Sequence, residues 1–117
     1  MKLDVVAAPM LVTAIAIGFL SGCTKSAPAT AAERGRQDYL TYCIQCHNPD
    51  PTQPGSQGPA LAGSSRELLE DRVLRLTYPP GYKPKRNTHT MLAMPQLAPK
   101  IDDLAAYLSQ AGKDQGQ

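Results

Sequence analysis

The sequence of 117 residues has no tryptophan and a single phenylalanine, and 42% of its residues are hydrophobic. A chain of this length and composition forms one small domain at most, and the core that its own side chains can build is modest. Eleven prolines and nine glycines indicate a loop-rich protein. We therefore expect the chain to need a further large apolar group at its centre in order to fold well.

Charge of one sign is not in excess. Twelve Lys and Arg side chains stand against ten Asp and Glu side chains, which gives a formal net charge of +2. Without residues 1–22 the balance is 11 basic against 9 acidic side chains, so the net charge is unchanged. This balance gives no case for a nucleic-acid partner. No set of general acid, general base and nucleophile is recognisable either, so we do not expect an enzyme.

Histidine and cysteine are scarce, with two and three residues. Most of them stand together in the segment Cys43–His47, whose sequence is Cys-Ile-Gln-Cys-His. A Cys-x-x-Cys pair could be half of a structural zinc site or a thioredoxin-like redox pair. Zinc would need further ligands, however, and Cys23 and His89 do not lie at a second-pair spacing. The same five residues are the attachment signature of a c-type haem.

The spacing of this motif has a physical reason. On a helical turn the sulfurs of Cys43 and Cys46 lie three residues apart on roughly the same side, and the next residue, His47, projects its ring toward the metal. Both thiols can then form thioethers with the porphyrin vinyl groups while the imidazole binds the iron. We predict one covalent haem c attached through Cys43 and Cys46, with His47 as the proximal iron ligand.

Met94, which is followed by Pro95, is the predicted ligand on the other side of the iron. A thioether is a soft ligand that favours reduced iron, and Pro95 stiffens the chain that must hold the sulfur. Three alternatives stay open: Met91, His89, which would give a bis-histidine haem of lower potential, and an iron without a sixth ligand. In a fourth alternative, Met94 is an ordinary core methionine and binds no metal.

Residues 1–22 have the pattern of an export signal. Lys2 begins a weakly charged segment, and a run of sixteen mainly apolar residues follows from Val5 to Leu20, shorter than the ~20 that a membrane-spanning helix needs. The sequence Leu-Ser-Gly before Cys23 resembles the lipobox of bacterial lipoproteins. The resemblance implies cleavage before Cys23 and lipidation of that cysteine. The alternative is an uncleaved membrane anchor.

The segment that follows, residues 24–32, consists mainly of Ala, Thr, Ser and Pro and has no apolar period. With Cys23 it is expected to form a lipidated tether, and nine extended residues reach about 30 Å. The predicted location is therefore the periplasmic or cell-surface side of a bacterial membrane, inner or outer.

Three helices are expected after the tether. The first runs over residues 33–43 and contains Gly35, whose cost of up to ~1 kcal/mol relative to alanine is explained by close contact with another helix. The second is opened by a capping box of Ser64 and Glu67 and ends near Tyr78. The third is predicted from apolar residues at helical spacing: Ile101, Leu104, Ala105 and Leu108.

A fourteen-residue stretch from Tyr78 to Met91 contains three prolines and the basic cluster Lys83, Lys85 and Arg86. A long irregular segment of this kind usually has a function or wraps a support, for which the porphyrin edge is the candidate. The basic cluster suits the docking of an acidic redox partner, and a solvated basic loop is the alternative.

Four further features resemble the class I cytochromes c of bacteria over residues 33–112. They are the pair Gly35 and Tyr39, the motif Gly58-Pro59-x-Leu61, the motif Met94-Pro95, and the pair Leu104 and Tyr107. The resemblance implies a small all-α fold of three to four helices and loops around one covalent haem, with the N- and C-terminal helices crossing. It also implies a hydrogen bond from the His47 ring to the Pro59 carbonyl. The basic segment before Met94 departs from the family, and the resemblance assigns no haem propionate contact there.

The expected function is one-electron transfer by a monohaem carrier whose partners are redox proteins, a reductase and an oxidase or dehydrogenase. The expected organisation is a signal peptide (1–22), a lipidated tether (23–32), a cytochrome c domain (33–112) and a polar tail (113–117). One alternative is a haem subunit of a larger dehydrogenase or oxidase complex. Another is a haem-based gas-binding or sensor protein in which Met94 is absent or displaceable.

Overall fold

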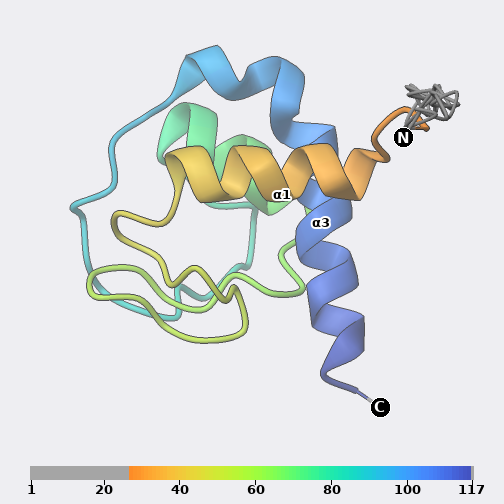
Figure 1. The fold of residues 1–117 in the computed structure, drawn as a ribbon. Helices are drawn as coiled ribbons and strands as arrows, with labels where there is room; N and C mark the ends of the chain where they lie inside the picture. The colour runs from red at the N-terminus through yellow and green to blue at the C-terminus, as the bar shows by residue number, and fades with distance from the viewer. Residues whose placement is uncertain (1–26, 117) are drawn as a thin grey trace, which may run out of the picture.

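The computed structural model describes residues 27–116, which form helices and loops without a strand in that range (Figure 1). The expected all-helical class is confirmed for this part of the chain. The predicted signal peptide and Cys23 lie outside the described residues. None of the helices described has the length and apolar character that crossing a membrane requires.

Helix α1 (Ala31–Tyr42) begins two residues before the predicted start and ends next to the Cys-x-x-Cys-His motif. Its first turn is closed by a capping box, in which the Glu33 amide donates to Thr30 Oγ1 at 3.2 Å and the Thr30 amide donates to the Glu33 carboxylate at 2.6 Å. The hydrogen bonds from Thr30 hold the pKa of Glu33 below its usual value. Local chemistry thus fixes where the helix enters the fold.

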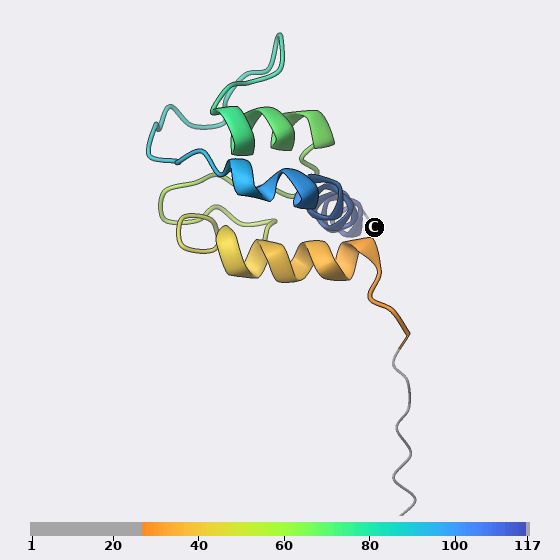
Figure 2. The same ribbon diagram turned by 90° about the horizontal axis from the view of Figure 1, so that it is seen from above.

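Helix α3 (Ile101–Asp114) runs across α1, as both ribbon views show (Figures 1 and 2). The crossing depends on Gly35, because a Cβ built at this glycine would collide with the carbonyl group of Asp103. The predicted close helix contact at Gly35 is confirmed. Helix α3 also extends through Asp114, so it includes the first two residues of the expected polar tail (113–117). The reason is that exposed polar residues extend a helix that its apolar face has already fixed.

An ion pair ties the two helices together beside Gly35. The Arg34 guanidinium donates two hydrogen bonds to the Asp103 carboxylate, at 2.7 and 2.8 Å. These bonds hold the pKa of Asp103 below its ordinary value of 3.8. A carboxyl whose pKa is lowered by folding stabilises the protein above its unfolded pKa, and that stabilisation is lost as the pH falls through the folded pKa.

Asp103→Asn is therefore expected to lower the melting temperature at pH 7 but not at strongly acidic pH. The difference from wild type should shrink as the pH falls below 3.8 and vanish once the pH is below the lowered pKa of Asp103 in the folded protein. Melting curves recorded by circular dichroism from pH 7 to pH 2 measure it. Asp102→Asn is the matched control, because Asp102 pairs with Arg66 on the surface instead of with α1. A difference that stays constant with pH would contradict the assignment.

The second helix consists of α2 (Arg66–Leu69) and a π-helical turn η1 (Glu70–Leu74). The predicted Ser64 capping box is wrong. The Ser64 amide closes a turn onto the Leu61 carbonyl at 3.0 Å, and it is Ser65 whose hydroxyl accepts from the Leu68 amide at 3.2 Å. The helix also ends earlier than predicted, because Leu76 has a left-handed φ of 59°.

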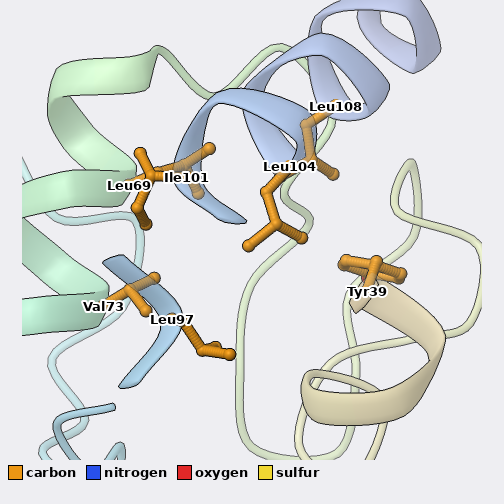
Figure 3. Packing of buried hydrophobic residues seen from close by; sticks show 7 residues of the cluster. All are labelled: Tyr39, Leu69, Val73, Leu97, Ile101, Leu104 and Leu108. Carbon is orange, nitrogen blue, oxygen red and sulfur yellow. The ribbon is translucent and has the colours of Figure 1, made fainter. Parts of the chain in front are cut away.

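A 3-10 helix, η2 (Pro95–Lys100), which the sequence pattern did not predict, leads directly into α3. It carries Leu97 into a core shared by all the helices (Figure 3). The buried residues of this core are Tyr39, Leu69, Val73, Leu97, Ile101, Leu104 and Leu108. Tyr39 also contacts Tyr107, with ring centroids 5.5 Å apart. The core is small, as the composition predicts.

Candidate haem-binding site

A cleft opens between the loop that follows the Cys-x-x-Cys-His motif, helices α2 and η1, and the irregular segment before Met94. Its cavity volume is about 100 Å³, and the cleft is open to solvent. Its lining residues are Cys46, His47, Gln57, Gly58, Pro59, Leu61, Ser64, Leu68, Leu69, Arg72, Val73, Tyr78, Tyr82, Lys85, Arg86, Thr88, Thr90 and Met91.

The motif itself continues from α1 as a helical turn. The amides of Cys46 and His47 both donate to the Cys43 carbonyl, at 3.3 and 2.9 Å. Both cysteines are free thiols with half-buried side chains; Cys46 lines the cleft and Cys43 packs against the core. Burial raises the pKa of the Cys43 thiol to about 11, so it is protonated at neutral pH.

The His47 ring is oriented by Pro59. Its Nδ1 lies 2.9 Å from the Pro59 carbonyl oxygen, the contact that the family resemblance implies. Because a carbonyl can only accept, Nδ1 carries the proton and Nε2 keeps a free lone pair. Burial lowers the pKa of His47; the hydrogen bond to Pro59 acts in the opposite direction, and the charge of Arg86 lowers the pKa further. A neutral imidazole with one free nitrogen is the form that binds a metal.

Two glycines let the following loop fold against the motif. A Cβ at Gly58 would occupy the space of the His47 ring, and a Cβ at Gly55 would collide with the backbone of Cys46 and His47. The Gly58 amide also donates to the Cys46 carbonyl at 2.9 Å. Gly58 belongs to the motif noted in the sequence. Gly55 was missed, because a proline-glycine pair indicates a turn without showing what the turn packs against.

The two candidate methionines take different positions. Met91 lines the cleft, whereas Met94 packs against the core at the start of η2 and is not among the lining residues. The Met94 amide donates to the carbonyl of Val73, a lining residue, at 2.7 Å, so the backbone of Met94 is fixed at the edge of the cleft. His89 is exposed and is not among the lining residues either.

The three residues of the basic cluster separate in the structure. Lys85 and Arg86 line the cleft and donate to carbonyl oxygens of the facing loop, Lys85 to Ala60 at 2.9 Å and Arg86 to Gly55 at 3.3 Å. Lys83 is exposed and lies outside the cleft lining. The irregular segment is thus tied across the loop that carries Pro59.

Within residues 27–116, no three His, Cys, Asp or Glu side chains gather as metal ligands, so the zinc alternative has no ligand set there. No protein-family model, curated protein or solved structure matches the chain. Function is therefore inferred from these residues and their geometry.

Proposed function

We propose that the protein is a monohaem c-type cytochrome of the class I fold, which carries single electrons at the outer face of a bacterial membrane. The observation that carries this proposal is the arrangement at His47. A half-buried imidazole on the wall of a largely apolar cleft is held by the Pro59 carbonyl with its Nε2 free, and it directly follows a Cys-x-x-Cys pair of free thiols. Each of these groups has a use in binding a c-type haem.

The residues present fit such a group. Cys43 and Cys46 would carry the thioethers, and His47 Nε2 would bind the iron. Leucine and valine side chains on α2 and η1, among them Leu69 and Val73, give the cleft an apolar wall that suits a flat apolar ring. When bound, the haem supplies a reversible one-electron change at its iron. The protein's part is to hold the ligands in place and to exclude water.

The fold and the distal side support the same proposal. The crossing of α1 and α3 at Gly35, with Tyr39 against Tyr107, has the arrangement that the class I resemblance implies. Met94 is proposed as the sixth ligand, because its amide bond to Val73 and the following Pro95 fix its backbone beside the cleft. Cleavage before Cys23 and lipidation of Cys23 complete the proposal for its location.

The double variant Cys43→Ala/Cys46→Ala is expected to lose all covalently bound haem. The wild-type chain, exported in a host that matures c-type cytochromes, should keep its haem on a denaturing gel and give a pyridine haemochrome spectrum of the two-thioether type. Each single variant should give the spectrum of one thioether, because one anchor remains. Cys23→Ser is the matched control and should keep haem fully. A wild-type protein without covalent haem would overturn the proposal.

A further inference from the structure

The cleft carries three cationic side chains, Arg72, Lys85 and Arg86, and no Asp or Glu occurs among the described residues that line it. Away from the cleft the charges are arranged differently. Four cations pair with carboxylates at 2.5–3.1 Å: Arg34, Arg66, Arg75 and Lys100. The remaining cations of the described residues form no ion pair, are exposed and lie outside this cleft: Arg36, Lys83 and Lys113.

Backbone carbonyls hold the three cleft cations in place. Arg72 donates to Leu76 at 2.7 Å, and Lys85 and Arg86 donate to the loop carbonyls described above. A carbonyl dipole orients a cation without cancelling its charge, whereas a carboxylate cancels it. The cleft is therefore positively charged and suits a ligand with negative groups.

Arg72 is fixed further by an aromatic stack. Its guanidinium lies 4.7 Å from the ring centroid of Tyr78, and Tyr78 stacks on Tyr82 with 5.3 Å between the centroids. The two tyrosines are brought together by a tight turn, in which the Tyr82 amide donates to the Pro79 carbonyl at 3.0 Å and Gly81 has a φ of 79°. The turn preorganises the stack, so Arg72 loses little freedom when it binds an anion.

We propose that Arg72, Lys85 and Arg86 bind the two propionate carboxylates of the porphyrin. This inference rests on the proposed function. A haem has a flat apolar body and two carboxylates, which matches a cleft with one apolar wall and three unneutralised cations. A guanidinium can bind a carboxylate through two parallel hydrogen bonds. Lys85 and Arg86 lie in the segment where the family resemblance assigns no propionate contact, and Arg72 belongs to η1.

The test uses the haem-loaded protein with ¹³C-labelled propionates, so that infrared difference spectra of the oxidised and reduced forms report these carboxylates. The variants are Arg72→Gln and Arg86→Gln, with Lys83→Gln as the control, since Lys83 has the same charge and lies on the same segment as Arg86 but outside the cleft. The propionate bands should shift in the two cleft variants and stay in place in the control. The reduction potential should also fall more in the cleft variants, because a cation beside the haem favours Fe(II).

Arg72→Lys separates charge from stacking and should retain the potential better than Arg72→Gln. Propionate bands that are the same in all variants would overturn the inference. Such a result would leave the proposed function intact as long as covalent haem is present. A protein without covalent haem would instead refute the proposed function, before any propionate band is measured.

Discussion

Met94→Ala is expected to abolish the far-red charge-transfer band of the ferric protein and to lower its reduction potential, whereas Met91→Ala should leave both nearly unchanged. The band reports a thioether bound to ferric iron, so its loss identifies the ligand. Axial ligands set haem potentials over a range of about 0.8 V, so removal of the sulfur should lower the potential by on the order of 0.1 V. Spectroelectrochemical titration measures both quantities in one experiment.

The structure makes these two residues a matched pair. Both are half-buried and pack against the same core, and they stand three residues apart. Met91 lines the cleft but belongs to an irregular segment, next to Leu92, whose side chain is 79% exposed. Met94 has its amide fixed to Val73 and is followed by Pro95 at the first turn of η2. A rigid backbone is what a ligand needs if it is to stay bound in both oxidation states.

The opposite result has a definite meaning. If Met91→Ala loses the band and Met94→Ala keeps it, Met91 is the ligand and the assignment to Met94 is wrong. If the wild type has a strongly negative potential and no far-red band, His89 becomes the candidate. Rapid binding of carbon monoxide by the ferrous wild type would favour the gas-binding alternative over simple electron transfer.

The parts of the fold that the sequence predicted are those governed by local periodicity and by steric demands. Helix α3 follows from apolar residues at helical spacing, and the contact of α1 with α3 at Gly35 follows from the cost of glycine in a helix. The hydrogen bond between His47 and Pro59 was implied by the resemblance to the class I cytochromes c. Residue spacing alone does not show which carbonyl the His47 ring faces.

The parts that escaped prediction depend on contacts between distant segments. Ser65 is the helix cap because the helix begins at Arg66, whereas Ser64 belongs to the preceding turn that its amide closes onto Leu61. A sequence pattern cannot show after which of two serines the helix begins. Three neighbouring cations look alike in the sequence, yet two of them bond to carbonyls 25 and 31 residues away. The role of Arg72 likewise required a turn that places Tyr78 against its guanidinium.

The helix crossing provides the second large expected effect. Gly35→Ala would stabilise an isolated helix by up to about 1 kcal/mol, because alanine is the better helix former. In this protein the added methyl group would collide with the Asp103 carbonyl, which belongs to the backbone of α3 and cannot move aside as a flexible side chain can. Insertion of a carbon into a packed contact typically costs about 1–3 kcal/mol. The collision should therefore outweigh the helix propensity, and the sign of the measured change decides between the two effects.

We expect Gly35→Ala to lower the free energy of unfolding of the haem-loaded protein by about 1–2 kcal/mol, and Gly35→Val to lower it more. Urea unfolding followed by circular dichroism measures the change. The variants Gln37→Gly and Gln37→Ala supply the control, since Gln37 is an exposed position of the same helix and their difference reports helix propensity alone. If alanine at position 35 stabilises the protein as much as it does at position 37, the helices do not need the glycine in order to meet. A loss of stability at position 35 alone would mean that the missing Cβ is what lets α1 approach the backbone of α3, and so what sets the position of the Cys43–His47 turn at the end of α1.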